Sequence, residues 1–228
     1  MVLPVYNEEG NILQVIEKIL QVLPGETRDF EIILVDDGST DKTAGILEKL
    51  KALDTQIKII RHPRNRGYGA SLRSGFQKAE KELIFMMDAD QQFDILDIKR
   101  LVTFIEDYDI VIGSREKRRD SFYRSLFSSC FNFIVKFLFK IRFQDINCGF
   151  KLFKREALQK MTLISTGGII SAEILMKASL QKLKIRQVPV NHYPRIYGQQ
   201  TGASLRVILT ILWEIGMLKL WMVKSSFQ

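Results

Sequence analysis

Acidic side chains follow three short apolar runs of this sequence. Glu8 comes shortly after the first run, and Asp36 and Asp37 follow the second. Asp88 and Asp90 follow the third. Ligands of open α/β sheets bind outside the carboxyl ends of the strands, so these acids are expected along one edge of a crevice. Carboxylates gathered in this way repel one another unless a divalent cation or the hydrogen-bond donors of a ligand occupy the site. The sequence therefore predicts a site for a cation and a ligand.

Asp88 and Asp90 form an Asp-x-Asp pair that suits a hard cation. With one small residue between them, both carboxylates can face the same ion and leave positions open for phosphate oxygens, and Gln92 can supply another oxygen. Mg²⁺ or Mn²⁺ bridging a diphosphate would stabilise the charge of a departing group. An isolated Asp-x-Asp is usually a solvated loop. The apolar run 83–87 directly before this pair favours the metal-binding interpretation.

Asp36 and Asp37 open an Asp-Asp-Gly-Ser-Thr segment that allows two interpretations. The same residue types form turns and helix caps. A carboxylate directly after a buried strand can instead accept a hydrogen bond from a nucleobase or a ribose hydroxyl. The Gly67-Tyr68-Gly69 segment matches neither a P-loop nor a dinucleotide fingerprint, because its glycine spacing differs and no Lys-Ser/Thr pair follows. It is interpreted as a flexible loop leading into a helix.

These residues need a scaffold that places strand ends side by side, and the hydropathy pattern supplies one. Short apolar runs alternate with amphipathic stretches, as in α/β proteins with a mainly parallel sheet. An apolar stripe over 12–23 predicts the first helix. With 228 residues the chain can bury one main core, and we predict a catalytic domain over 1–203. The predicted strands are 2–5, 31–35, 57–60, 83–87, 110–112 and 185–190.

The basic charge of the chain is concentrated in the segment 115–155. This segment holds eleven Lys or Arg residues, three acidic residues and nine of the fifteen phenylalanines. Within it, 122–143 has the spacing of an amphipathic helix, which either packs on the sheet or contacts a membrane. A second amphipathic helix is predicted for 204–228, where charged residues interrupt the apolar ones too often for a bilayer span. Basic residues mixed with phenylalanine favour an anionic membrane surface over nucleic acid.

Cysteine usage and the first residues bear on the compartment. Cys130 and Cys148 show no pattern of a disulfide framework. The first seven residues, Met-Val-Leu-Pro-Val-Tyr-Asn, lack the basic start and long apolar stretch of a signal peptide. We therefore expect a cytoplasmic protein that binds peripherally to the cytoplasmic face of a membrane.

Six ordered sequence blocks together resemble those of family 2 glycosyltransferases of the dolichol-phosphate mannose synthase type. The resemblance covers nearly the whole chain and implies the GT-A nucleotide-diphospho-sugar sandwich, with 122–143 as its interfacial helix. It also implies Mg²⁺ or Mn²⁺ and a nucleotide-diphosphate sugar, with GDP-mannose and UDP-glucose both open. The blocks are Pro4–Glu9, Val35–Thr40, Asp88–Gln92, Gly113–Arg115, Asp145–Lys151 and Arg195–Gly198.

The same resemblance assigns roles to individual residues. It implies that Asp88, Asp90 and Gln92 hold the metal, and that Arg124 and Arg195 bind the phosphate of a polyprenyl or dolichyl acceptor. Guanidinium groups suit this role because their fixed fork binds two phosphate oxygens at once. The residues implied to bind the nucleotide sugar are Pro4, Tyr6, Glu8, Val35, Asp37, Asp88, Ala89, Asp90, Arg115 and Arg195.

The expected reaction is inverting transfer, in which an acceptor oxygen attacks the anomeric carbon as the metal-bound nucleoside diphosphate departs. A polyprenyl phosphate oxygen is already anionic, so it needs no base. A saccharide hydroxyl would need one, and Asp145 and Glu173 are the candidates, although Asp145 suits a structural cap equally well. The predicted catalytic residues are Asp88, Asp90, Arg115, Asp145 and Glu173.

Other interpretations remain beside this one. Gly198 is followed by Gln-Gln-Thr-Gly, where the family usually has a Ser-Lys pair, so acceptor recognition is expected to differ. An enzyme of the same fold could act on saccharide or protein hydroxyls. A catalytically silent membrane-binding module is a further alternative, against which the intact Asp88 and Asp90 pair argues. A nucleic-acid binder ranks last.

Overall fold

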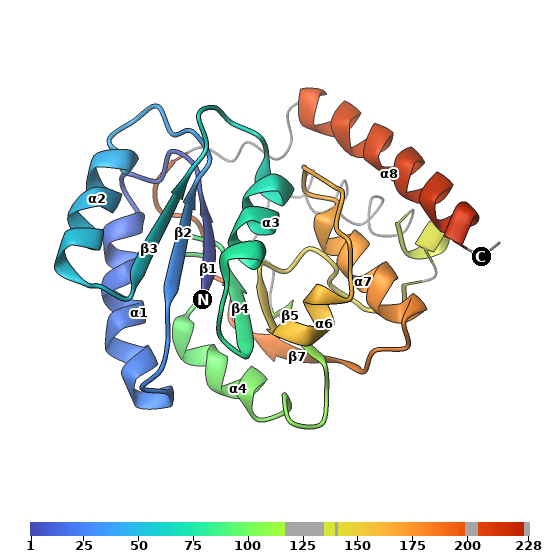
Figure 1. Cartoon of the computed structure of the whole chain (residues 1–228), viewed down its shortest axis with the longest axis horizontal. Helices are drawn as coiled ribbons and strands as arrows, with labels where there is room; N and C mark the ends of the chain where they lie inside the picture. The colour runs from blue at the N-terminus through green and yellow to red at the C-terminus, as the bar shows by residue number, and fades with distance from the viewer. Residues whose placement is uncertain (117–134, 140, 199–204, 226–228) are drawn as a thin grey trace.

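The computed structural model describes residues 1–116, 135–139, 141–198 and 205–225 as an α/β sandwich (Figure 1). Within these residues, seven strands form one sheet in the order β3-β2-β1-β4-β6-β5-β7. Paired strands are parallel, except that β6 runs antiparallel to β4 and β5. The strands are β1 (Val2–Val5), β2 (Ile32–Asp36), β3 (Ile57–Arg61), β4 (Leu83–Met87), β5 (Ile110–Arg115), β6 (Phe150–Lys154) and β7 (Ile185–Val190).

Six strands lie where the hydropathy pattern predicts them, and β6 was missed. Lys151 and Lys154 interrupt its apolar residues, so the pattern assigned it to the basic segment. In the structure Lys151 is fully buried, and its ammonium group donates hydrogen bonds to the Cys148 carbonyl and, at 3.2 Å, to Ser171 Oγ. A buried charge is tolerated when it is hydrogen-bonded. Hydropathy alone cannot indicate such partners.

Helices cover both faces of the sheet (Figure 1). Alternate residues of a strand point to opposite faces. Leu3 accordingly belongs to the core that includes α1 and α2, while Val2 belongs to the core that includes α3 and α7. Each fully buried aliphatic side chain of these two cores contributes about 1.5–3 kcal/mol of transfer free energy. The helices are α1 (Ile12–Glu26), α2 (Thr43–Leu53), α3 (Tyr68–Lys78), α4 (Ile98–Val102) after the 3₁₀ turn η1 (Ile95–Asp97), α6 (Arg155–Gln159), α7 (Ile170–Leu180) and α8 (Leu205–Ser225).

Helix α3 lies close against the sheet at Gly75. A Cβ atom at this position would overlap the side chain of Val2 and would lie 3.3 Å from Val35 Cγ2. The missing side chain therefore lets α3 approach β1 and β2 closely. This approach fixes where α3 begins, at Tyr68, relative to the strand ends.

The amphipathic C-terminal helix predicted for 204–228 is present as α8, which packs on the core through Ile215 and Leu218. The predicted interfacial helix, 122–143, lies mostly outside the described residues. Of its described part, 135–139 are helical and 141–143 are not, so the helix was predicted to end too late. Within the described parts of the chain, no helix is long and apolar enough to cross a membrane. A separate catalytic domain over 1–203 remains a prediction.

Candidate active site

The topology of the sheet brings the predicted acids to one edge. β2, β1 and β4 are parallel neighbours, with Val5 opposite Asp36. Glu8, Asp37 and Asp88 follow the carboxyl ends of these strands. Since β6 is antiparallel to both β4 and β5, the end of β5 at Arg115 lies at this same edge. The segment 145–149, which enters β6, lies there as well.

Asp88 is the central carboxylate of this edge. Its Oδ1 accepts a 2.7 Å hydrogen bond from the Tyr68 hydroxyl. Burial, and then the negative charge of Asp90, raises the pKa of Asp88 to about 7. Burial, followed by the charge of Asp88, raises the pKa of Tyr68, so its phenol stays protonated as the donor. Asp88 also lies against Gly149, where a Cβ atom would overlap its carboxylate, so the backbone passes here without a side chain.

Asp88 and Asp90 fit a hard divalent cation. The charge of Asp90 raises the pKa of Asp88, and a cation between the two would relieve this repulsion. Oxygen ligands are the donors that Mg²⁺ prefers, together with substrate phosphates. Among the described residues, no group of three His, Cys, Asp or Glu side chains could hold a metal. The Gln92 side chain donates to the Tyr193 carbonyl at 3.1 Å, and its role as a metal ligand stays a prediction.

Arg195 is brought to the same place from the segment after β7. Its guanidinium donates to Glu8 Oε1 at 2.6 Å and to Asp90 Oδ2 at 3.4 Å. Its Nε–H donates to the Tyr197 carbonyl at 2.6 Å. Burial raises the pKa of Glu8, and hydrogen bonds from Asn11 and Arg195 act in the opposite direction. Arg195 therefore supplies a positive charge directly beside the predicted metal ligands.

Arg115 and Asp145, both predicted to be catalytic, form an ion pair. The Arg115 guanidinium donates to Asp145 Oδ2 at 2.7 Å and to Oδ1 at 2.9 Å, and the Arg115 amide donates to Oδ2 at 3.2 Å. This fork arrangement fixes both side chains. Asp145 thus orients Arg115 at the edge of the site, which agrees with the structural alternative more than with a free base.

The structure shows the turn interpretation at Asp36, whereas it buries Asp37 among hydrogen-bond donors of the chain itself. Asp36 accepts from the Ser39 amide at 2.9 Å, which is turn chemistry, and pairs with Arg61 at 3.2 Å. Asp37 is buried and accepts hydrogen bonds from the Arg66 amide at 2.9 Å and the Gly67 amide at 2.8 Å. Gly67 is thus tied to Asp37, and α3 begins at the next residue, as expected for a segment that leads into a helix.

His62 is a residue that the sequence analysis missed. Its Nδ1 lies 2.6 Å from Asp37 Oδ1, and its Nε2 lies 2.9 Å from Ser74 Oγ. His62 directly follows β3, the neighbour of β2. The rule that residues after parallel strands reach the ligand edge therefore applied to His62 as it did to the acids. His62 thus contacts Asp37 Oδ1, whereas the Gly67 amide donates to Oδ2.

Within the described part of the chain, the remaining residues predicted to bind the nucleotide sugar or the acceptor make no side-chain hydrogen bond to the site carboxylates. Pro4 and Val35 pair across β1 and β2, and Val35 is fully buried with its side chain near α3, so its role in nucleotide binding stays a prediction. Tyr6 is half-buried and Ala89 is buried. Arg124 lies outside the described residues.

The structure does not bring Glu173 to the carboxylates of the strand ends. Glu173 lies on α7, fully buried, and accepts hydrogen bonds from the amides of Ile164 and Ser165 at 2.8 Å each. The Lys177 ammonium group donates to it at 2.6 Å. This geometry is that of a structural anchor for the loop before α7, and it argues against the prediction of Glu173 as a base.

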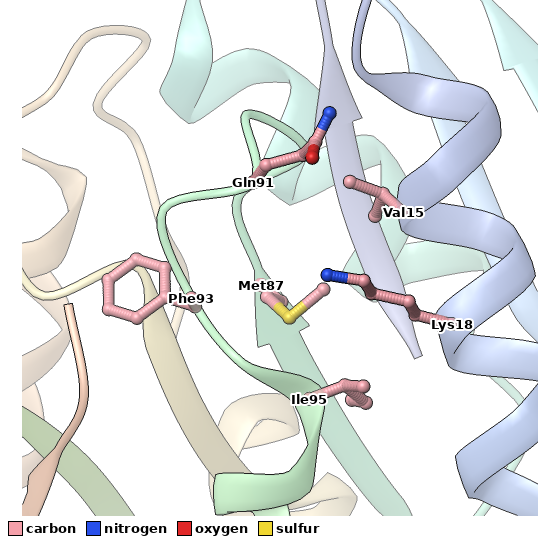
Figure 2. A pocket seen from close by; sticks show the side chains of 6 residues that line it. All are labelled: Val15, Lys18, Met87, Gln91, Phe93 and Ile95. Atoms are coloured by element: carbon pink, nitrogen blue, oxygen red, sulfur yellow. The ribbon is translucent and has the colours of Figure 1, made fainter. Parts of the chain in front are cut away.

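A small cavity of about 20 Å³ lies between α1 and the segment that includes the end of β4 (Figure 2). That volume is about the size of one water molecule. It does not serve as a sugar site. The cavity is lined by Val15, Lys18, Met87, Gln91, Phe93 and Ile95.

Comparison with known families agrees with this geometry. The model of the family described as glycosyl transferase family 2 matches residues 1–162. The chain belongs to glycosyl transferase family 2. The prediction drawn from the six sequence blocks is thereby confirmed at the level of the family. The match spans β1 to β6, and so includes the strand ends that carry Glu8, Asp37 and Asp88.

Curated relatives of this family 2 chain transfer sugars to polyprenyl phosphates, by their names. An undecaprenyl-phosphate 4-deoxy-4-formamido-L-arabinose transferase of Proteus mirabilis is 30% identical over 210 residues, which is 91% of this chain and 64% of that protein. A dodecaprenyl-phosphate galacturonate synthase of Rhizobium johnstonii is 29% identical over 220 residues, 93% of this chain and 64% of that protein. The chain thus spans 64% of the length of each relative.

Solved structures confirm the predicted GT-A type fold. Glucosyl-3-phosphoglycerate synthase of Mycobacterium tuberculosis superposes with a TM-score of 0.70 at 22% identity, covering 94% of this chain and 79% of that one. A crystal structure of the same enzyme with Mn²⁺, uridine-diphosphate-glucose and phosphoglyceric acid gives a TM-score of 0.69. At this level of identity the likeness establishes the architecture of the family 2 chain and leaves its substrates open.

Proposed function

We propose that this chain carries the catalytic site of an inverting glycosyltransferase. It moves a hexose from a nucleotide-diphosphate sugar to a polyprenyl phosphate at a membrane surface. One observation carries the proposal: the Asp88 and Asp90 carboxylates lie at a sheet edge where Arg195 contacts Asp90 and Arg115 ends a strand. Cation ligands beside fixed guanidinium groups suit a diphosphate with its metal.

The donor half of the site follows from the residues of the strand ends. Mg²⁺ or Mn²⁺, held by Asp88 and Asp90, supplies Lewis-acid stabilisation of the leaving diphosphate. Arg115 is held in a fixed orientation by Asp145, and its role is to position phosphate oxygens. Asp37, after the end of β2, is buried and binds His62 and the amides of Arg66 and Gly67, so it supports the nucleotide side of the site through these neighbours. GDP-mannose and UDP-glucose remain the two candidate donors.

An anionic acceptor agrees with the arrangement of the candidate bases. Asp145 has both oxygens engaged by Arg115, and Glu173 is buried among amides and Lys177. Neither carboxylate is placed to take a proton from an acceptor hydroxyl. A phosphate oxygen needs no such base because it is ionised at neutral pH. The names of the relatives support this acceptor class.

The membrane surface is proposed from an exposed apolar face of α8 and the neighbouring helical residues 135–139. Trp213, Met217 and Leu220 are 65%, 42% and 62% exposed, and they recur at helical spacing on α8. Phe137 is 77% exposed. Lys219 on α8 donates to the carbonyl of Leu138 at 3.2 Å, which ties the two segments together. Helices with such apolar faces lie in the membrane interface.

The test is transfer of a radiolabelled sugar from GDP-mannose or UDP-glucose, with Mn²⁺, to a polyprenyl phosphate. We expect a labelled product that partitions into chloroform, with at least a hundredfold loss for Asp90→Asn because the cation loses a charged ligand. The matched control is Asp107→Asn, which makes the same chemical change at an exposed position. Equal rates for the parent and Asp90→Asn would refute the proposal. Labelled product that stays in the aqueous phase would favour a hydroxyl acceptor.

A further inference from the structure

We propose that α8 positions the donor site and that Glu214 is the residue through which it does so. Glu214 holds the loop 164–168, here named the bridging loop, and the bridging loop holds the first turn of α3. Gly67 and Tyr68, at the start of α3, bind Asp37 and Asp88. The inference deepens the proposed function, because it concerns the same donor site.

The first link joins α8 to the bridging loop. Glu214 is 3% exposed, and its Oε1 accepts hydrogen bonds from the Thr166 amide at 2.6 Å and the Gly167 amide at 2.9 Å. The Thr166 hydroxyl donates to the same oxygen at 3.0 Å. Hydrogen bonds to a buried carboxylate are stronger than those between neutral groups. One side chain of α8 therefore fixes the backbone of the bridging loop.

The second link joins the bridging loop to α3 through backbone alone. The Thr166 carbonyl accepts from the amides of Gly69 at 2.7 Å and Ala70 at 3.1 Å. A Cβ atom on Gly67 would lie 2.5 Å from the Thr166 oxygen, and one on Gly69 would lie 2.7 Å from the Gly167 oxygen. The two glycines let the backbones touch, so no flexible side chain separates them. A displaced bridging loop must displace the start of α3.

The third link joins the start of α3 to the carboxylates of the site. The Gly67 amide donates to Asp37 Oδ2 at 2.8 Å, and the neighbouring Tyr68 hydroxyl donates to Asp88 Oδ1 at 2.7 Å. Two consecutive residues thus bind acids from two different strands. The nucleobase-side carboxylate and the metal-side carboxylate are both positioned by the segment that the bridging loop holds.

The bridging loop is also held by a second side chain, so a change at Glu214 can loosen the loop without unfolding the protein. Glu173 on α7 accepts from the amides of Ile164 and Ser165 at 2.8 Å each. The loop therefore keeps one attachment when Glu214 is altered. Helix α8 also keeps its contacts with α7, where the Lys177 ammonium lies 4.2 Å from the Trp221 ring centroid. We expect Glu214→Gln to fold, with a loosened bridging loop.

The experiment compares Glu214→Gln with the parent in two measurements. The first is hydrogen exchange of the amides of Gly67 and Gly69 without ligand, which we expect to quicken about tenfold, in line with the loss of a hydrogen bond to a charged group. The second is the Kd for Mn²⁺ with UDP, and separately with GDP, which we expect to rise about tenfold for the nucleotide that binds. The matched control is Glu17→Gln on the exposed face of α1, with both quantities at parent values.

The outcomes separate this inference from the proposed function. A lower Tm with parent-like exchange at Gly67 and Gly69 would overturn the inference and leave Glu214 a purely structural residue. A parent-like Kd would overturn it as well. If the parent binds neither nucleotide, the proposed function fails, and the exchange measurement still decides the positioning link. Should Glu214→Gln not fold, Thr166→Val removes the hydroxyl donor alone, and unchanged exchange in that variant would overturn the inference.

Discussion

Asp88→Asn is expected to make the metal-free protein more stable at neutral pH, although it removes a proposed metal ligand. Burial, and then the charge of Asp90, raises the pKa of Asp88 from 3.8 to about 7. Between these values the folded protein holds a proton that the unfolded chain has released. The free energy of unfolding of the parent therefore falls as pH rises through this window and levels off above about pH 7. Asparagine carries no charge, so the variant lacks this fall.

The size of the effect follows from the pKa shift. One pKa unit corresponds to about 1.4 kcal/mol, and the shift of Asp88 is roughly three units, so the full effect is at most about 4 kcal/mol. Coupling to Asp90 and partial contact with water reduce it. We expect the stability advantage of Asp88→Asn to grow by about 2 kcal/mol between about pH 5 and pH 7.5. The amide oxygen of asparagine can still accept the hydrogen bond from Tyr68.

The assay is urea unfolding in EDTA at several pH values, followed by the fluorescence of Trp213 and Trp221. Asp107→Asn serves as the control, since it removes an exposed carboxylate, and its difference from the parent should stay flat with pH. A flat difference for Asp88→Asn as well would refute the reasoning, because it would mean that the folded protein does not shift this pKa. Mn²⁺ should then stabilise the parent and leave Asp88→Asn unchanged.

Three further predictions follow from single contacts. Gly149→Ala should destabilise the fold by about 1–3 kcal/mol in thermal unfolding, because the new Cβ would overlap the Asp88 carboxylate. The control Gly45→Ala has nothing within 4 Å of its new Cβ and should stabilise α2. Equal effects of the two substitutions on unfolding would contradict this prediction. Arg115→Lys should lower kcat at least about tenfold, since lysine cannot make the paired hydrogen bonds to Asp145. A parent-like kcat would contradict a role for the oriented guanidinium group in the reaction. The double variant Trp213→Glu and Leu220→Glu should co-sediment with anionic vesicles about tenfold more weakly than the parent. Its Kd for Mn²⁺ and nucleotide should stay constant. Undiminished sedimentation would place the membrane surface elsewhere.

The strand ends show how far local pattern predicts a site. Glu8, Asp37 and Asp88 could be assigned to one edge because apolar runs of strand length precede them and parallel strands end together. Periodicity could not assign their neighbours, and only the family resemblance placed Arg195 at this site. Arg195 reaches Glu8 across 187 positions of the chain, and periodicity carries no information about such a contact.

The strand β6 shows where the same reasoning fails. The two lysines of β6 lowered its mean hydropathy, so the pattern did not predict a strand there. No local sequence feature predicted that β6 runs antiparallel to its neighbours. That direction decides the chemistry, because it returns Asp145 and Gly149 to the edge that carries Asp88. Glu173 shows a related limit, since a carboxylate on a helix can face the interior or the site with the same sequence spacing, and here it is buried.

The sequence by itself determined the family, the alternation of strands and helices, and the acids that meet at one sheet edge, because these depend on residue type and short-range spacing. Only the tertiary structure decided which arginine pairs with which acid, that His62 supports Asp37, and that Glu214 of α8 reaches the loop behind α3. Those contacts join residues far apart in the chain. Their partners are set by how the layers pack, and by the need of each buried polar group for a hydrogen bond.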